Sequence, residues 1–396
     1  MRESRFRSEP EPGGSGVFLK LRTISMDSWG EDVAANIRGE GTYIFDTSNG
    51  VNSTNRFEII EGAPIKALFM LVSMDDRTMI LFGAHDGANL NPMLIRYCAS
   101  ENYNDWEATY TNNAGDLLID KGTEIITAVY TKKLIFVLTD TAAYVMVRQD
   151  FPIIYSIDHV GSECGGISPG CAIAVNNRIY WMSGASFYMY DGVVQPLECD
   201  VHSDVFGNMN ITQRDKITCG HNPDFKEIWW CFPSAGSSEN NMEVIYNYQE
   251  KTWAVGARGR TAFASQQAFF TKPIAATPDH ILVEHENGTN DSGVAIPYVY
   301  ETYDFQLNDG NNIAMVTKIL PDFKDFTGSC AVSFNVKKEP EDNAKTIGPK
   351  TILPSTRKKS FKARGRQISM KIEANDPATS FTLGPVRVKA ADDGEE

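Results

Sequence analysis

One segment of the sequence has the spacing of a serine nucleophile. Gly166-Ile-Ser168-Pro-Gly170 matches the Gly-x-Ser-x-Gly pattern in which a hydrolase presents its serine on a sharp turn. That chemistry also needs the backbone N–H of the next residue, because this group stabilises the oxyanion. Pro169 has no N–H, so the mechanism lacks its donor. We therefore interpret the segment as a turn before a strand at 172–175.

Two pairs of cysteine and histidine could bind zinc if they came together in space. Cys199-x-x-His202 and Cys219-x-His221 contain two thiols and two imidazoles, which are common zinc ligands. Neither pair has the C-x-x-C spacing of a secure zinc site, and buried thiols with loop histidines are the simpler interpretation. We expect no metal or cofactor, and seven reduced cysteines, since an odd number makes a poor disulfide framework.

Two further enzyme motifs are absent from the sequence. It contains neither the sialidase box S-x-D-x-G-x-x-W nor the phosphate-binding loop G-x-x-x-x-G-K-[ST]. A pair of glycosidase carboxylates, about 5 to 9 Å apart, cannot be recognised among 51 acidic residues. We predict no catalytic residues and hence a protein that is not an enzyme.

The most concentrated charge is a basic segment near the C-terminus. Residues 357–371 include seven basic and no acidic residues, whereas the other 381 carry 30 basic and 51 acidic ones. Alternate residues of a strand share a face, so Lys358, Lys362, Arg364 and Arg366 would form a basic stripe. Either the stripe is a solvated face paired with the acidic remainder, or it contacts phosphate or an acidic partner subunit.

Composition and charge exclude several functional classes. Of 396 residues, 42% are hydrophobic and 11% aromatic, which is typical of an ordered globular chain. A net charge of −14 argues against general nucleic-acid binding but suits a surface along which DNA slides without adhering. The longest apolar stretches, such as 67–74, are too short to cross a membrane, and residues 1–16 lack the apolar core of a secretory signal.

Short runs of β-branched and aromatic residues, bounded by Gly, Asn, Asp and Pro, predict an all-β chain. Asn176-Asn177 predicts a tight hairpin turn between strands at 172–175 and 178–182, because both residues tolerate a positive φ. The predicted strands are 41–45, 65–72, 79–82, 124–130, 134–138, 143–148, 172–175, 178–182, 187–190, 227–232, 243–248 and 280–284.

One pattern repeats along the chain: a strand ends in aromatic residues and runs into an acidic or amide residue. The repeats start near residues 43, 95, 144, 187, 244 and 281, at intervals of 52, 49, 43, 57 and 37. Their mean is close to the roughly 40 to 50 residues of a propeller blade. We predict a β-propeller of five to seven blades, six favoured, over residues 29–297. A run of β-sandwiches is the alternative.

The pattern changes after residue 297. About five longer strands, at 298–307, 313–320, 330–336, 360–372 and 380–388, predict an appended β-sandwich-like sheet over 298–391, with a linker at 337–355. Residues 1–28 are expected to be flexible or incomplete, and 392–396 to form an acidic tail. In the strand at 360–372 the apolar residues change from odd to even positions after Gly365, which predicts a β-bulge at that glycine.

Short motifs occur in a fixed order between residues 29 and 389. They are Ile95-Arg96 to Trp106, Ala114-Gly115-Asp116, Gly165-Gly-Ile-Ser168, Tyr180-Trp-Met182, Phe187-Tyr-Met-Tyr-Asp-Gly192, Phe225-Lys-Glu-Ile-Trp-Trp230, Pro233-Ser234, Tyr246-Asn247 with Trp253, Arg260-Thr-Ala262, Pro321-Asp-Phe323 and Arg364-Gly-Arg-Gln367 with Leu383-Gly384. This set resembles the tail nozzle or tail-hub (tail tubular) proteins of short-tailed bacteriophages. Members of that family are often longer before the position of Trp29, so this chain is either a short version or truncated.

The resemblance implies a structural protein of the virion tail, assembled in the host bacterial cytoplasm. It implies a homo-oligomeric ring, expected to be hexameric, that lies below the head–tail adaptor protein and docks tail fibres or spikes. Genomic DNA would pass through the lumen without specific binding. The alternatives are a receptor- or glycan-binding propeller, in which exposed Trp and Tyr stack on sugars, and a propeller hydrolase.

Overall fold

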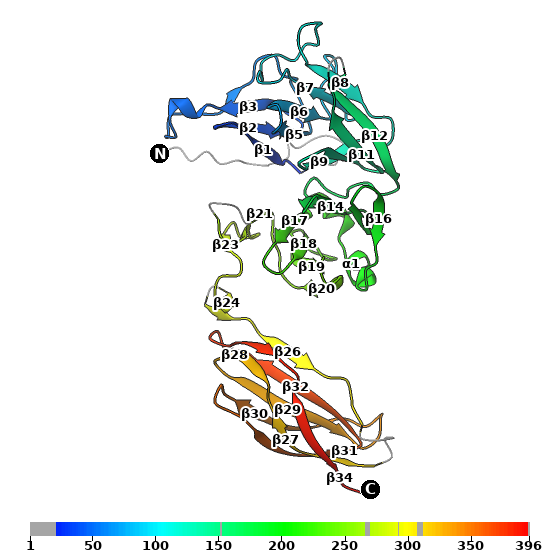
Figure 1. Cartoon of the computed structure of the whole chain (residues 1–396), viewed down its shortest axis with the longest axis vertical. Coiled ribbons are helices and arrows are strands. Elements are labelled where there is room, and N and C mark those ends of the chain that lie inside the picture. The colour runs from blue at the N-terminus through cyan, green and yellow to red at the C-terminus, as the bar shows by residue number, and fades with distance from the viewer. Residues whose placement is uncertain (1–20, 151–152, 266–269, 292, 307–311, 395–396) are drawn as a thin grey trace. The chain divides into compact units, whose positions relative to one another are not determined.

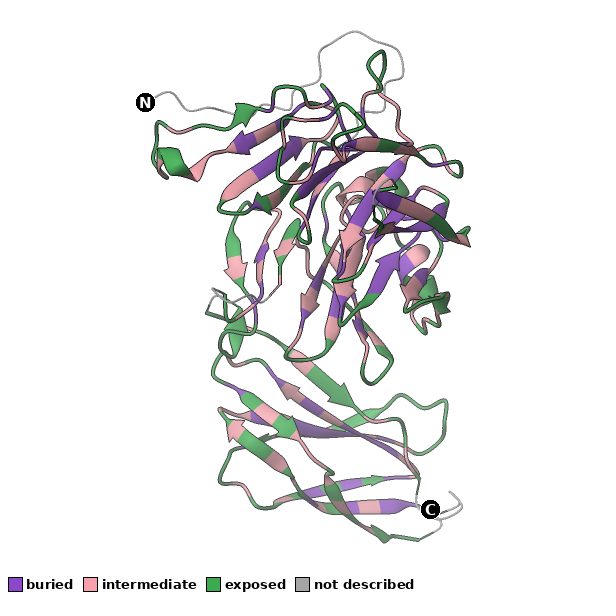
Figure 2. Cartoon of the chain, turned by 45° about the horizontal axis from the view of Figure 1, so that its top comes forward, coloured by how far each residue is buried: buried purple, intermediate pink, exposed green. Residues whose placement is uncertain are grey.

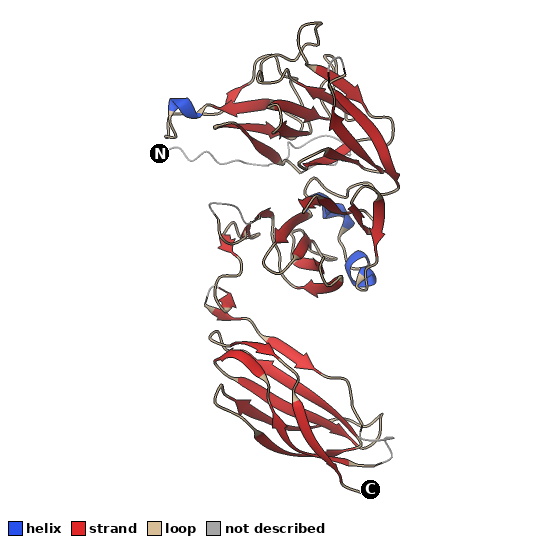
Figure 3. Ribbon diagram, viewed as in Figure 1, coloured by secondary structure: helices blue, strands red, loops and turns tan. Residues whose placement is uncertain are grey.

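The structure is a computed structural model that describes residues 21–150, 153–265, 270–291, 293–306 and 312–394. The chain divides into two compact units, Met1–Glu286 and Asn287–Glu396. Both units are built almost entirely of strands (Figures 1 and 3), so the all-β prediction is confirmed. The predicted flexible segment lies outside the described residues as far as residue 20, and so do residues 395–396 of the predicted acidic tail.

In the described part of the first unit, five four-stranded antiparallel sheets and one three-stranded sheet follow one another along the chain. Sheet 1 contains β1 Ile24–Trp29, β2 Asp32–Ile37, β3 Thr42–Phe45 and β4 Glu58–Ile59; sheet 2 contains β5 Phe69–Ser73, β6 Thr78–Phe82, β7 Leu94–Tyr97 and β8 Gly115–Leu118; sheet 3 contains β9 Ile125–Tyr130, β10 Ile135–Thr139, β11 Ala142–Arg148 and β12 Tyr155–Ser162. Sheet 4 contains β13 Ala172–Val175, β14 Arg178–Met182, β15 Phe187–Tyr190 and β16 Val194–Leu197; sheet 5 contains β17 Thr218–Asn222, β18 Glu227–Phe232, β19 Met242–Asn247 and β20 Thr252–Gly256; sheet 6 contains β21 Ala262–Ala264, β22 Ile274–Ala276 and β23 Leu282–Glu284.

Each sheet pairs its strands in chain order, and the first strands of successive sheets contact one another from β1 to β21. This is the arrangement of propeller blades, because a lone four-stranded sheet cannot bury its own faces. The β-propeller prediction is confirmed, with six sheets as blades. The three short helices, η1 Thr47–Asn49, α1 His202–Phe206 and η2 Ile211–Lys216, lie in connections between described strands.

The sequence repeat has a structural explanation. Its six starting positions fall on or beside β3, β7, β11, β15, β19 and β23, which are the third strands of the six sheets. The repeat therefore marks the same strand in each sheet, so one period of the sequence corresponds to one blade. The tight turn at Asn176-Asn177 is also confirmed, since both residues have positive φ, 50° and 67°.

Large aromatic side chains fill the core between the sheets. Trp181, Trp230 and Phe187 are fully buried in one cluster formed by sheets 3 to 5, and Figure 2 shows buried positions concentrated along the strands. The two indoles also make polar bonds: Trp181 Nε1 donates to the Cys164 carbonyl at 2.6 Å and Trp230 Nε1 to the Cys171 carbonyl at 2.9 Å. Packing and hydrogen bonds therefore hold neighbouring sheets together at the same points.

The second unit is a β-sandwich with a small hairpin before it. The hairpin pairs β24 Asn290–Asp291 with β25 Val294–Ala295. One sheet has the order β26-β32-β29-β30, the facing sheet β31-β27-β34, and β28 pairs with β33. Their bounds are β26 Tyr298–Glu301, β27 Ala314–Leu320, β28 Phe323–Thr327, β29 Cys330–Lys337, β30 Lys345–Ile352, β31 Lys359–Gly365, β32 Gln367–Ala374, β33 Ser380–Leu383 and β34 Arg387–Asp392.

The structure corrects three expectations about segment boundaries. The predicted linker at 337–355 contains strand β30, which pairs with β29 and carries the buried Ile352. The segment predicted to be flexible, 1–28, includes most of β1, because alternate residues of β1 lie half-buried against its neighbours. The division between units follows Glu286 and not residue 297, so the hairpin of β24 and β25 belongs to the second unit.

The predicted β-bulge at Gly365 is wrong. The segment 360–372 forms two strands, β31 and β32, that lie in different sheets of the sandwich. Phe361 on β31 and Ile368 on β32 face the same core from opposite sheets. The apolar residues therefore change from odd to even positions where the chain passes from one sheet to the other. Gly365 does not have a positive φ; a Cβ there would lie 2.9 Å from the Lys337 carbonyl oxygen, so close approach explains the glycine.

We predict that Trp230→Phe lowers the free energy of unfolding by about 1 to 3 kcal/mol, because it leaves the buried Cys171 carbonyl without its donor and opens a small cavity. Urea unfolding of the full chain measures this loss. Trp253→Phe is the matched control: its Nε1 donates to the Glu198 carbonyl at 2.7 Å in a partly exposed position, where water can replace the donor. Equal losses in both variants would contradict the prediction.

Candidate functional site

The four predicted contact residues lie on β31 and beside its two ends. Arg364 Nε pairs with Asp393 Oδ2 at 2.5 Å, and Arg366 Nη1 pairs with Glu339 Oε1 at 2.8 Å, where the chain crosses between sheets. Lys358 and Lys362 are exposed and form no ion pair with any residue that the structure describes. The intramolecular alternative therefore applies to the two arginines, and the two lysines remain available to a partner.

The strand register extends this positive charge over three strands. Lys318 on β27 lies opposite Ser360 on β31 and opposite Lys389 on β34, and Arg364 lies opposite Met315. The outward positions of this sheet carry five basic residues, which we call the basic face: Lys318, Lys362, Arg364, Arg387 and Lys389. The strands β31, β27 and β34 contain one acidic residue, Asp392, at the end of β34.

A second concentration of polar side chains, with Glu243 and His285 buried and Arg258 partly buried, lies between sheets 5 and 6. Arg258 Nε donates to Glu243 Oε2 at 2.7 Å, and the Arg258 guanidinium lies 4.4 Å from the centre of the Trp229 ring. His285 joins them, with its Nε2 accepting from Arg260 Nε at 3.1 Å and its Nδ1 lying 3.4 Å from Arg258 Nη1. The cluster connects the three-stranded sheet 6 to sheet 5.

Burial controls the protonation of this cluster. Removal from water, together with the positive charges of Arg258 and Arg260, lowers the pKa of His285 to about 3. Burial raises the pKa of Glu243, while the attraction of Arg258 opposes that rise. At neutral pH this imidazole is not protonated to the imidazolium that acts as a general acid, so the cluster fits a structural role better than acid catalysis.

A third polar contact lies where alternate sheets meet. Arg38 follows β2 of sheet 1 and its Nη2 donates to Oε1 of Glu124, which precedes β9 of sheet 3, at 2.6 Å. Burial lowers the pKa of Arg38, and the negative charge of Asp215, which precedes β17 of sheet 5, opposes this shift. Residues from sheets 1, 3 and 5 can approach one another only near the axis of the propeller, so this ion pair lies close to that axis.

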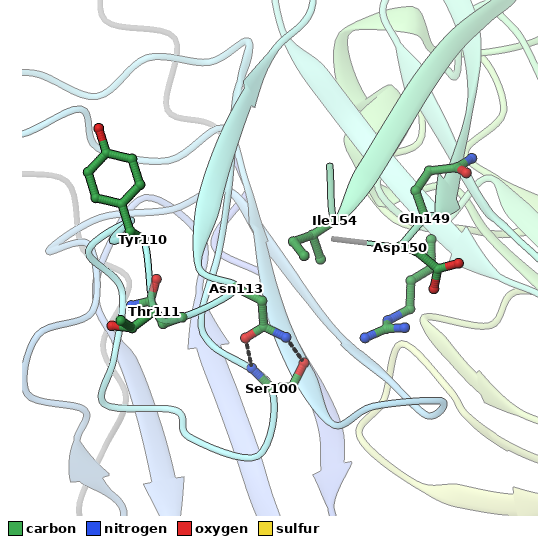
Figure 4. A pocket seen from close by; sticks show the side chains of 9 residues that line it. Ser100, Tyr110, Thr111, Asn113, Gln149, Asp150 and Ile154 are labelled. Carbon is green, nitrogen blue, oxygen red and sulfur yellow. Dashed lines mark hydrogen bonds between the residues drawn. The ribbon is translucent and has the colours of Figure 1, made fainter. Parts of the chain in front are cut away.

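A cavity of about 420 Å³ lies between sheets 2 and 3 (Figure 4). Several of its polar groups already bond protein partners: the Ser100 N–H donates to Asn113 Oδ1 at 2.8 Å, and Arg148 Nε donates to Asp76 Oδ2, outside the lining, at 2.6 Å. Tyr110 stands at the rim and is 99% exposed. Asp150 is the one carboxylate in the lining, so the paired carboxylates of a glycosidase are not assembled in this cavity.

The structure also places the other residues considered from sequence. Ser168 is fully buried, and its Oγ donates to the Ile217 carbonyl at 2.7 Å, so it joins sheets 4 and 5 and cannot attack a substrate. His202 Nε2 lies 2.8 Å from the Ala185 carbonyl and His221 Nε2 3.2 Å from the Tyr248 hydroxyl. Within the described ranges, no three His, Cys, Asp or Glu residues are arranged to hold a metal, and all seven cysteines are free thiols.

Sequence reasoning missed Lys318, Arg387 and Lys389 of the basic face, and also the cluster around His285. The first three are far from the basic segment in sequence and join it only through strand pairing. Arg258 and Arg260 follow β20, whereas His285 follows β23, and no spacing rule connects the two positions.

No helix in the described ranges is long and apolar enough to cross a membrane.

No protein-family profile matches the sequence, and no curated protein matches it. Among solved structures, the computationally designed Ika8 protein is 9% identical with a TM-score of 0.41, over 65% of this chain and 69% of that one. The AfRom2 CNH domain is 9% identical with a TM-score of 0.39, over 72% and 91%. The apo form of AztD from Citrobacter koseri is 8% identical with a TM-score of 0.40, over 66% and 69%. These distant similarities carry no argument about function.

We predict that acidification destabilises the first unit through His285. The unfolded imidazole takes up a proton near its ordinary pKa of 6.5, whereas the folded one does so only near 3. The unfolded state therefore binds more protons in this window, and stability falls as the pH drops from 6.5 toward 3. Melting temperatures measured between pH 7.5 and 4.5 should fall less steeply for His285→Gln than for the wild type.

His159→Gln is the control for this measurement, because His159 is an exposed histidine on β12. Its melting temperatures should follow the wild-type dependence on pH. A His285→Gln variant with the same pH dependence as the wild type would show that His285 is not the residue responsible.

Proposed function

We propose that this protein is a non-enzymatic structural subunit of a phage tail, forming the nozzle or hub ring that conducts the genome and docks fibres or spikes. The observation that carries the proposal is the use of the buried polar groups: they join sheet to sheet and do not converge on a cleft. Arg38 pairs with Glu124, and Ser168 bonds the Ile217 carbonyl. Arg258 bonds Glu243 of sheet 5 and lies 3.4 Å from Nδ1 of His285, which follows the last strand of sheet 6. Such a block resists deformation and performs no chemistry.

The charge distribution supports the same role. The first unit carries 22 basic and 36 acidic residues, whereas the second carries 15 of each, so the whole net charge of −14 belongs to the first unit. An acidic lumen would repel a passing DNA duplex and keep it from adhering. The DNA would travel along the axis of the oligomer, because side chains usually fill or narrow the centre of a propeller and the buried pair of Arg38 and Glu124 lies close to its axis.

The proposal includes the partners that the family resemblance implies. The subunit would assemble in the host bacterial cytoplasm into a homo-oligomeric ring, expected to be hexameric, and would join the virion below the head–tail adaptor protein. The strand pairing of the first unit suits a subunit of such a ring. The first strand of each sheet contacts the next sheet, so few strand edges are left unpaired to associate with other proteins.

A glycan-binding propeller is the second candidate, and the cavity of Figure 4 favours it. Tyr110 presents an exposed ring at the rim, and hydroxyl, amide and carboxylate groups line the wall. Aromatic rings stack on sugar faces, and polar side chains bond sugar hydroxyls. Against this candidate, Ser100, Asn112 and Asn113 already bond neighbouring protein groups, which leaves few donors for a ligand.

We predict that the purified full chain forms rings visible by negative-stain electron microscopy, either alone or after addition of the adaptor ring. The expected result is one class of closed particles with rotational symmetry. Monomers under both conditions would contradict the proposal.

The glycan alternative has its own test in the same preparations. Binding of host surface polysaccharide that Tyr110→Ala abolishes, by a chain that forms no ring, would favour that candidate. Turnover in a glycosidase or esterase screen that is lost in a variant of a single acidic residue would show that the protein is an enzyme.

A further inference from the structure

The basic face has a feature that works against stability. Lys318 and Lys389 lie directly opposite each other on neighbouring strands, and like charges in this position destabilise a sheet. Neither lysine, nor Lys362 or Arg387, forms an ion pair with a residue in the described ranges. These positive charges are unbalanced within the sheet, so an external anionic partner would relieve a repulsion already present in the fold.

The two sheets of the second unit differ in how their charges are paired. The strands of the other sheet carry both signs, and there Glu301 accepts from Asn335, Glu373 pairs with Lys371 and Lys337 pairs with Asp304. The basic face therefore holds positive charges with few acidic neighbours on its own strands. Such a distribution orients an encounter with a negatively charged surface.

The chain itself contains a surface of the opposite charge. Residues 149–213 hold seven acidic residues and one basic residue, Arg178. Five exposed acids of this region form no ion pair with a described residue, and we call them the acidic edge: Asp158, Glu163, Asp191, Glu198 and Asp200. They lie on or beside β12 and β16, which are the last strands of sheets 3 and 4. These two strands are close together, because a Cβ added to Gly161 on β12 would lie 3.0 Å from Val194 Cγ2 on β16.

The composition of the basic face favours a protein over DNA as its partner. Met315, Leu320 and Ala391 occupy outward positions among the cations, and Leu320 is 40% exposed. Protein interfaces combine apolar residues with charged ones at the rim, whereas interfaces with DNA are more polar and more positive. The aliphatic stems of the lysines add to the apolar area that a protein partner would cover.

We propose that the basic face of one copy of this chain docks against the acidic edge of a neighbouring copy. The contact links the second unit of one subunit to the first unit of the next, and repetition of this head-to-tail contact closes a ring. The inference rests on the proposed function, since it names the interface through which the ring forms.

Crosslinking between isotopically distinct copies tests the contact directly. Full-length chains, unlabelled and ¹⁵N-labelled, are mixed at low salt and treated with a carbodiimide, which joins lysines to carboxylates in contact. Mass spectrometry should find mixed-isotope links from Lys318, Lys362 or Lys389 to the acidic edge, and 0.5 M salt should reduce them. Absence of such links in the wild type would overturn the inference.

Charge reversal gives a second measurement. Arg387→Glu with Lys389→Glu should weaken self-association in sedimentation velocity by about tenfold or more, a lower bound set by the strength of close charge pairs at interfaces. The variant should still fold, because it places a carboxylate opposite Lys318. Lys338→Glu with Lys345→Glu is the matched control: it makes the same change in charge at exposed positions associated with the other sheet and should leave association unchanged.

The outcomes separate this inference from the proposed function. Rings that form normally from the Arg387→Glu, Lys389→Glu variant would overturn the inference and leave the nozzle proposal standing. A second result would also overturn the inference: the wild type binds a 30-base-pair DNA duplex, and the variant loses this binding while its crosslinks between copies persist unchanged. The basic face would then be a phosphate-binding surface. Rescue of association by mixing this variant with an Asp158→Lys, Asp191→Lys chain would support the proposed pairing of surfaces.

Discussion

The fold depends on the contact between the first strand of each sheet and the first strand of the next. A first strand lies at the edge of its sheet, so its backbone N–H groups need partners from outside. Side chains of sheet 1 supply some of them: Ser25 Oγ accepts from the Met70 N–H at 3.1 Å and Asp27 Oδ2 from the Val72 N–H at 2.9 Å. The same need explains why buried polar residues of the first unit serve contacts between sheets, and why the unit suits a mechanical role.

The fold class followed from the sequence because the strands at the middle of each sheet carry the strongest pattern. The predicted strands 172–175, 178–182 and 187–190 match β13, β14 and β15 residue for residue. Strands such as β16 and β20 were missed, because their exposed residues and a proline leave no continuous apolar run. Ala262–Ala264, in the last sheet, is too short to produce a period.

The candidate site was only partly accessible from sequence. The basic segment around Lys362 is continuous in the chain, so composition revealed it, but Lys318 and Lys389 join it through a register that no local rule specifies. Gly365 illustrates the same limit. A change of parity was visible in the sequence, yet a bulge within one strand and a crossing between two sheets produce the same pattern, and only the pairing of β31 and β32 distinguishes them.

The first and last sheets of the propeller share no strand among the described residues: sheet 1 takes all four strands from the chain start, and sheet 6 is built from three consecutive ones. In such an arrangement a whole sheet can be added or removed at one end of the unit without breaking the strand-to-strand backbone hydrogen bonds within any other sheet. Duplication or loss of a gene segment of blade length would then change the circumference stepwise, and the size of the subunit could vary in evolution independently of its outer surfaces.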